Sequence, residues 1–186
     1  LNTILGGGLL SSRLNQNIRE DKGYSYGVRS TLQYDKTIGY FAAGGNVRNE
    51  VTDSAVVEML GEMEQLRTGL VPEKELNSVK SFIFGSFARS TERPETVARF
   101  ALNIARYKLP KDYYATYLEQ VEGVTPQRIQ EAAQKYLLPD QAYIVVVGNA
   151  GAVAEPMQRV APVVMYDKEG QPIDRAGLSV PEGLTA

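Results

Sequence analysis

Segment 5–27 combines a glycine run, a polar helix that carries Arg19 and a tyrosine-rich strand that carries Tyr26, and it suggests chemistry more sharply than any other part of this sequence. An arginine can donate charge-assisted hydrogen bonds to carbonyl oxygens, and a tyrosine hydroxyl is a neutral donor. Each residue also has a plainer interpretation. Arg19 could pair with its acidic neighbours Glu20 and Asp21. Tyr26 falls, by the strand period, on an apolar face, where it would be a core tyrosine.

The elements that position both residues are predicted from segment 5–27, LGGGLLSSRLNQNIREDKGYSYG. Its three successive glycines take positive φ at little cost. We interpret them as a turn rather than a phosphate cradle, because no G-x-x-x-x-G-K-[ST] motif is present. A helix follows, capped by Ser11 or Ser12 and ended by Gly23. Its apolar stripe consists of Leu10, Leu14 and Ile18.

The same segment resembles the second half of zinc peptidases of the insulinase family, which includes pitrilysin and the mitochondrial processing peptidases. That half carries Gly-Gly, Ser-Arg-Leu, Ile-Arg-Glu and Gly-x-x-Tyr at similar spacing, and a weaker likeness continues to about residue 150. The resemblance implies that Arg19 and Tyr26 bind the backbone of a peptide substrate opposite the zinc. It also implies an α+β fold of the LuxS and processing-peptidase kind, with a mostly antiparallel sheet, helices on one face, and first strands upstream of Leu1.

Histidine and cysteine are both absent from the sequence. The zinc of this family is held by an H-x-x-E-H motif, whose histidines bind the metal while the glutamate activates water. Asp and Glu alone make a poor zinc site. We therefore expect no metal ligand, no cofactor and no catalytic residue in this chain. Its expected partners are a peptide substrate and a zinc-bearing H-x-x-E-H domain or subunit.

Two functions of other classes stay open. The chain could be a scaffold or assembly subunit that keeps the fold without a proteolytic role, as core subunits of respiratory complexes do. It could also be a peptide-binding module that adds a strand at an open sheet edge. An H-x-x-E-H domain in the same precursor, or encoded beside it, would favour the peptidase.

Length and composition favour one soluble domain without a nucleic-acid or membrane partner. The chain has 186 residues, is 43% hydrophobic and carries a formal net charge of −2. Charges of both signs leave no basic footprint for nucleic acid, and no apolar run approaches the roughly 20 residues that cross a bilayer. The lack of cysteine fits the periplasm and the cytoplasm of a bacterium equally. An oligomer remains open.

Along the chain, strands come first, then helices, then one more strand. Residues 24–33 and 37–46 flank a polar turn and predict an antiparallel hairpin. Helical periods predict helices that begin near residues 50, 72, 94, 113 and 126, and the tyrosines of the fourth are interpreted as core. The run 143–147, YIVVV, predicts a strand buried on both faces. We expect a domain over 1–166 and an extended tail over 167–186.

Overall fold

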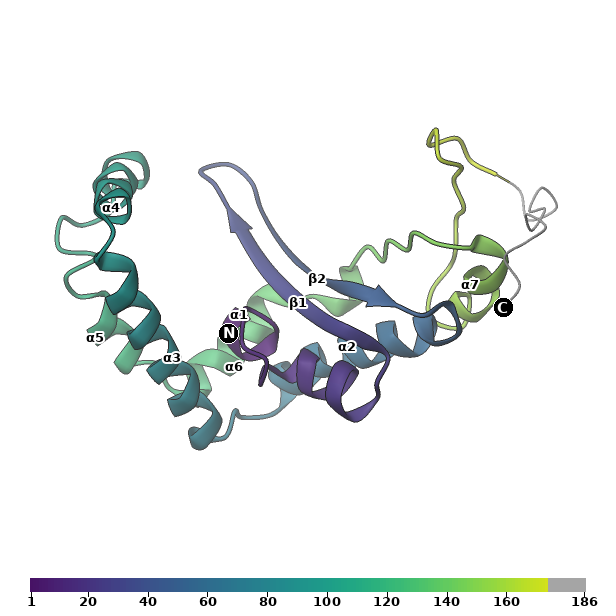
Figure 1. Ribbon diagram of the computed structural model, residues 1–186, viewed down its shortest axis with the longest axis horizontal. Coiled ribbons are helices and arrows are strands. Elements are labelled where there is room, and N and C mark those ends of the chain that lie inside the picture. The colour runs from purple at the N-terminus through teal and green to yellow at the C-terminus, as the bar shows by residue number, and fades with distance from the viewer. Residues whose placement is uncertain (174–186) are drawn as a thin grey trace.

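A long β-hairpin crosses the middle of the molecule, with helices below it and at both ends (Figure 1). The computed structural model describes residues 1–173. Its elements are α1 (Asn2–Leu5), η1 (Asn15–Asp21), β1 (Ser25–Tyr34), β2 (Gly39–Val47), η2 (Asn49–Val51), α2 (Thr52–Thr68), α3 (Glu73–Thr91), α4 (Pro94–Tyr107), α5 (Tyr117–Glu122), α6 (Pro126–Tyr136), η3 (Pro139–Gln141) and α7 (Ala150–Met157). Strands and helices are segregated along the chain, which confirms the predicted α+β class.

The hairpin is the two-stranded antiparallel sheet that the alternating sequence predicts. Its register runs from Val28 opposite Gly45 to Tyr34 opposite Gly39. The turn is closed by Asp35, whose backbone N–H donates to the carbonyl of Ile38 at 2.9 Å.

The core lies on one face of this hairpin, where α1, η1, α2 and α6 meet. Its most completely buried side chains are Ile4, Leu5, Leu14, Ile18, Leu66, Leu137, Val28 and Ser12. Burial of one large aliphatic side chain is worth about 1.5–3 kcal/mol. The other face of the hairpin is exposed, as an antiparallel sheet allows.

Helix α6 packs along α2 and closes its C-terminal end. The side-chain amide of Gln134 donates to the carbonyl of Arg67 at 2.9 Å, and that of Gln130 donates to the carbonyl of Thr68 at 3.0 Å. The last carbonyls of a helix have no partner within it. The glutamines therefore supply the donors that α2 lacks.

Helices α3, α4 and α5 form an arm that extends away from the core (Figure 1). Only the first part of α3 enters the core, through Leu76 and Val79. Further along, the Phe100 ring stacks on Tyr114 with centroids 3.8 Å apart and on Phe87 at 5.7 Å. These contacts agree with the interpretation of the tyrosines as packing residues.

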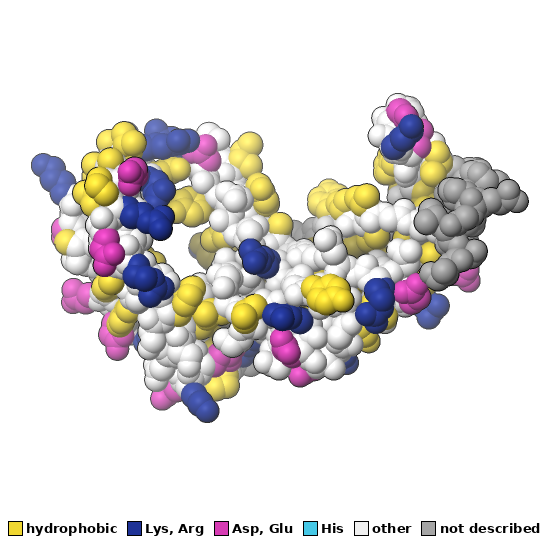
Figure 2. Space-filling view, in the orientation of Figure 1, with side chains coloured by type: hydrophobic (Ala, Val, Ile, Leu, Met, Phe, Trp, Pro, Cys, Tyr) yellow, Lys and Arg dark blue, Asp and Glu magenta, His cyan; other side chains and the backbone are white. Residues whose placement is uncertain are grey.

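The tip of the hairpin touches the end of α4. The Arg106 guanidinium donates to both carboxylate oxygens of Asp35, at 2.8 and 2.9 Å, and the rings of Tyr34 and Tyr107 lie 6.2 Å apart. The backbone N–H of Lys36 and this guanidinium hold the pKa of Asp35 below its ordinary value. Elsewhere the arm stands apart from the hairpin, and the face in Figure 2 carries charges of both signs.

The prediction of a buried strand over 143–147 is wrong. The segment has no strand partner among the described residues, and its backbone is irregular between η3 and α7. Tyr143, Val145 and Val147 are 98%, 84% and 95% exposed. The helix that follows, α7, is absent from the sequence predictions; Asn149 caps it by accepting a hydrogen bond from the Gly151 N–H at 3.1 Å.

The expected tail lies partly within the described residues. Residues 167–173 fold back on themselves, because the Asp167 N–H donates to the Gln171 carbonyl and the Ile173 N–H donates to the Met165 carbonyl, at 2.9 and 3.0 Å. The remainder, 174–186, lies outside the described residues.

Candidate functional site

Arg19 lies on η1, which is a π-helix and not the predicted α-helix. The Lys22 N–H donates to the Asn17 carbonyl, five residues back, at 2.9 Å. Of the predicted stripe, Leu14 and Ile18 are buried, but Leu10 lies in a turn before the helix begins and is 71% exposed. π-helical turns are rare and often occur at functional sites.

The helix ends where the sequence predicts, at Gly23, which adopts φ +62°. The Tyr24 N–H then donates to the Ile18 carbonyl at 2.9 Å, which turns the chain into β1. Arg48 steadies this turn by donating to the Gly23 carbonyl at 3.0 Å. Arg19 and Tyr26 therefore lie on adjoining elements joined by a short, hydrogen-bonded turn.

Asn15 attaches η1 to β1. Its buried side-chain oxygen accepts a hydrogen bond from the Val28 N–H at 3.0 Å. Its amide nitrogen donates to the Leu9 carbonyl at 3.2 Å and to the Ser12 hydroxyl at 3.1 Å. One side chain thus fixes the spacing between the helix that carries Arg19 and the strand that carries Tyr26.

Asn17 attaches the opposite side of η1 to α2. Its amide nitrogen donates to Glu58 at 2.9 Å and to the buried Glu62 at 2.8 Å. The ammonium of Lys22 lies 2.9 Å from Glu58. Hydrogen bonds from Lys22 and then Asn17 hold the pKa of Glu58 below its ordinary value, since both favour the carboxylate.

The sequence did not indicate that four residues position the site: Asn15, Asn17, Glu58 and Glu62. The i, i+4 spacing of Glu58 and Glu62 on α2 places them on one helix face and is a weak signal for a shared partner. Nothing in the sequence identifies Asn17 as that partner, because its direction depends on the π-helical turn.

The side chain of Arg19 is partly exposed and lies close to its own neighbour. Its Nε atom is 3.4 Å from Glu20 Oε1, and both side chains are more than one-third exposed. An exposed pair of this kind contributes about 0–1 kcal/mol. The pairing with Glu20 anticipated from the sequence therefore occurs, but it costs little to exchange for another partner.

Tyr26 is fully exposed, with 100% relative accessibility, so it is not a core tyrosine. The strand register is irregular between Ser25 and Val28. Ser25 stabilises this irregularity by donating to the Asn46 carbonyl at 2.6 Å and accepting from the Gly27 N–H at 3.1 Å. The bulge releases Tyr26 from the alternation that buries Val28.

Arg13 has a structural role. Its guanidinium donates through Nε and Nη2 to both carboxylate oxygens of Glu75, each at 2.9 Å, and so joins the start of η1 to α3. This bidentate contact holds the pKa of Arg13 above its ordinary value. Arg29 is exposed on β1.

The glycine run forms a turn in which Gly6 packs closely against the backbone of β1. A Cβ on Gly6 would lie 2.6 Å from the backbone nitrogen of Ser30, whose N–H donates to the Gly6 carbonyl at 3.0 Å. Gly8 adopts φ +111° in open space. The structural interpretation of this turn accounts for both residues.

Within residues 1–173, no group of three or more acidic side chains is arranged to hold a metal ion. No helix in this described part of the chain is long and apolar enough to cross a bilayer. The site thus offers donors, from a guanidinium and a phenol, without a metal ligand beside them.

The fold is that of the non-catalytic domain of M16 peptidases. A solved peptidase M16 inactive domain from Pseudomonas fluorescens superposes with a TM-score of 0.70 at 26% identity, over 75% of this chain and 33% of that one. Residues 1–82 match the model of the peptidase M16 inactive domain family. The resemblance stated from the sequence is confirmed.

Two further structures share the fold. A candidate zinc protease from Bordetella pertussis Tohama I gives a TM-score of 0.61 at 23% identity, over 74% of each chain. A chain of complex III2 from Candida albicans gives 0.60 at 12% identity, over 72% of this chain and 34% of that one. No curated protein matches. The present chain spans about a third of the Pseudomonas structure.

Proposed function

We propose that this chain is the substrate-binding, non-catalytic domain of an inverzincin-type zinc peptidase. In this proposal Arg19 and Tyr26 bind the backbone of a peptide held opposite a zinc-bearing H-x-x-E-H domain or subunit, and that domain would supply the activated water for peptide-bond hydrolysis. The observation that carries the proposal is Tyr26, a tyrosine fully exposed by a bulge beside the helix of Arg19.

The chemistry of the two side chains supports this role. The Arg19 guanidinium can exchange its exposed contact with Glu20 for a substrate carbonyl at little cost. The Tyr26 hydroxyl faces solvent and can donate to a carbonyl or a developing oxyanion. The hydrogen bonds of Asn15 and Asn17 fix the helix that carries Arg19, so less conformational entropy is lost when a peptide binds.

The test combines this chain with its zinc-bearing partner and measures peptide cleavage and thermal stability. Arg19→Ala should lower kcat/KM by about 10²-fold, the usual effect of losing a transition-state donor. Tyr26→Phe should lower kcat/KM without moving Tm, because it deletes only an exposed hydroxyl. Arg29→Ala and Tyr40→Phe, both exposed on the same hairpin, are matched controls and should cleave at the wild-type rate.

The alternative function is a scaffold with the same fold and no proteolytic role. The likeness to a chain of complex III2 shows only that the fold occurs in such an assembly. A scaffold predicts that Arg19→Ala and Tyr26→Phe fold normally and leave cleavage unchanged. That result would replace the substrate-binding proposal with the scaffold.

A further inference from the structure

The far end of the arm carries an excess of positive charge. Segment 89–112 has six Lys and Arg residues and three Asp and Glu residues, whereas the whole chain has a formal net charge of −2. All six cationic side chains are exposed: Arg89, Arg93, Arg99, Arg106, Lys108 and Lys111. Positive charge is therefore concentrated in one part of a chain that is negative as a whole.

Most of these cations have no anionic partner. Arg106 pairs with Asp35 at 2.8 Å. None of the other five forms an ion pair with a residue in the described part of the chain. The Arg99 guanidinium donates only to the Thr96 hydroxyl, at 3.5 Å. Five positive charges at this end of the molecule thus face solvent without a carboxylate to neutralise them.

The dipole of α4 explains only part of this arrangement. A cation is favoured near the C-terminus of a helix, so Arg106 and Lys108 are well placed at the end of α4. Arg93, the N-cap of α4, lies instead at the positive end of the dipole. Arg99 lies too far from either end to be stabilised by it. An anion from outside the chain would account for these two positions.

The same face of α4 carries Arg99 and Arg106, because seven residues make nearly two full turns, or about 10 Å along the axis. This face is turned toward the hairpin, since Arg106 donates to Asp35 at the hairpin tip. Figure 2 shows a hollow between the arm and the hairpin. The Lys and Arg side chains of the arm lie mainly on the side of this hollow, and its Asp and Glu side chains lie mainly on the outer side. The hollow therefore has a positively charged wall.

The hairpin connects this wall with the candidate site. Tyr26 lies near its base, and Tyr34, eight residues further on, contacts Tyr107 of α4. At about 3.3 Å per residue, β1 covers about 26 Å between the two positions. An extended peptide has a similar rise per residue. A peptide that is bound at Tyr26 and runs along the hairpin thus reaches the arm about eight residues from the bound position.

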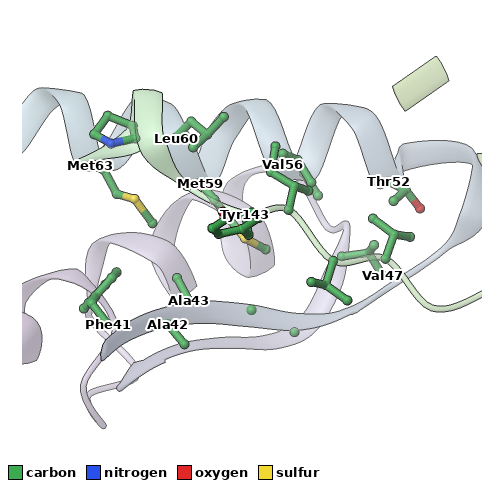
Figure 3. A pocket seen from close by; sticks show the side chains of 18 of the residues that line it. Phe41, Ala42, Ala43, Val47, Thr52, Val56, Met59, Leu60, Met63 and Tyr143 are labelled. Atoms are coloured by element: carbon green, nitrogen blue, oxygen red, sulfur yellow. The ribbon is translucent and has the colours of Figure 1, made fainter. Parts of the chain in front are cut away.

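A groove elsewhere on the hairpin offers no comparable attraction. It has a volume of about 820 Å³ and lies between β2, α2 and residues 142–148 (Figure 3). None of its lining residues is charged. Apolar side chains such as Val56, Met59 and Met63 point from α2 toward β2 and Tyr143. Selection by charge therefore has to come from the arm and not from this groove.

We propose that the positively charged wall of the arm is a second binding site for the substrate, and that it takes an acidic segment of the peptide about eight residues from the scissile bond. This inference rests on the proposed function and names the class of substrate, a peptide with clustered Asp or Glu side chains. Arg93 and Arg99 attract this segment without a competing carboxylate, whereas Arg106 is held by Asp35. Such attraction acts on capture and orientation of the peptide more than on the chemical step.

Two matched peptides test the proposal in the complex of this chain with its zinc-bearing partner. Both have the same cleavable core, flanked at each end, about eight residues away, by Glu-Glu-Glu in one peptide and by Gln-Gln-Gln in the other. The Glu peptide should have a KM about 10-fold lower at a similar kcat, and salt at about 0.5 M should remove the difference. The double variant Arg93→Gln/Arg99→Gln should raise the KM of the Glu peptide by about 3–10-fold and leave that of the Gln peptide unchanged.

Lys74→Gln/Arg128→Gln is the matched control, since both side chains are exposed cations outside the far end of the arm. It should leave both KM values unchanged. Both double variants replace exposed side chains, so their Tm should equal that of the wild type. Fluorescence anisotropy of the labelled Glu peptide, with the complex kept inactive by a chelator, should show the same weakening for Arg93→Gln/Arg99→Gln without any cleavage.

The outcomes separate this proposal from the function on which it rests. Arg19→Ala should lower kcat/KM for both peptides equally, so a failure at Arg19 and a failure at the arm are seen in different measurements. Equal KM values for the two peptides, or an equal effect of Arg93→Gln/Arg99→Gln on both, would overturn the proposal. Unchanged peptide binding by this variant, together with a loss of binding to phosphatidylserine vesicles, would overturn it in favour of an anionic membrane surface.

Discussion

The two edges of the hairpin differ in how their backbone groups are satisfied. On β1, the outward N–H groups of Val28 and Ser30 donate to Asn15 and Gly6, so α1 and η1 cover this edge from within the chain. On β2, the outward groups face a groove. Buried backbone donors and acceptors are almost always paired. The described residues therefore complete the β1 edge, whereas they leave the outward backbone groups of β2 unpaired.

The covered edge also carries the candidate site. Asn15 pairs the edge of β1 and positions η1, which carries Arg19. The pairing of the β1 edge and the position of Arg19 therefore both depend on the Asn15 side chain. The open edge of β2 carries no residue of the candidate site, and the segment 143–147, which lines the same groove, lacks regular secondary structure.

The largest expected contrast is between two apolar residues, one beside each edge of the hairpin. Ile18→Ala removes a fully buried side chain beneath the covered edge and should reduce the free energy of unfolding by about 2–5 kcal/mol. Val145→Ala, in a segment where that valine is 84% exposed, should change it by less than about 0.5 kcal/mol. Urea denaturation of both variants of the 186-residue chain is the measurement. Equal losses would mean that the β2 edge is closed in this chain.

A smaller effect is expected from removing the side chain that pairs the β1 edge. Asn15→Ala leaves the Val28 N–H without an acceptor and should cost about 1–3 kcal/mol. Asn46→Ala, in the exposed part of β2, is the matched control and should cost little. Denaturation combined with amide exchange at Val28 measures both the loss and its location. A Val28 amide that stays as protected as in the wild type would contradict the assigned hydrogen bond.

The smallest effect concerns pH at the contact between η1 and α2. The folded state lowers the pKa of Glu58, so its stabilising contribution is present above the unfolded pKa and is lost as pH falls through the folded one. Because the pair with Lys22 is partly exposed, the loss should be below about 1 kcal/mol. Glu58→Gln should flatten this part of the stability profile, and Glu131→Gln, an exposed control, should leave it unchanged. Identical profiles of stability against pH for wild type and Glu58→Gln would show that the Glu58 carboxylate does not stabilise the contact between η1 and α2.

The sequence predicts the parts of the fold that local patterns determine. Alternation gives the hairpin, and helical periods place the starts of two helices: α4 begins at Pro94, and α6 begins at Pro126, where Thr125 caps it by accepting from the Arg128 N–H. The predicted cap at Ser11 or Ser12 is wrong, because η1 has no side-chain cap. Gly23 ends η1 at the predicted position with positive φ. These features depend on single residues and on periods, which a sequence displays directly.

The features that sequence reasoning missed depend on contacts with distant residues. The π-helical turn of η1 directs Asn15 and Asn17 to partners on β1 and α2, which the local sequence does not display. The exposure of Tyr26 depends on a bulge that shifts the strand alternation. The run 143–147 has the composition of a strand, but composition cannot show whether a neighbouring strand is present.

Because the hairpin tip contacts α4, the arm formed by α3, α4 and α5 is held at two points. Its base is packed into the core by α3, and its far end is attached by the rings of Tyr34 and Tyr107 and by the pair of Asp35 and Arg106, which lie 71 residues apart in the chain. Both charged side chains are more than half exposed, so dissolved ions weaken their attraction. The stiffness of the far end therefore follows ionic strength, while the base is held by packing that salt does not screen.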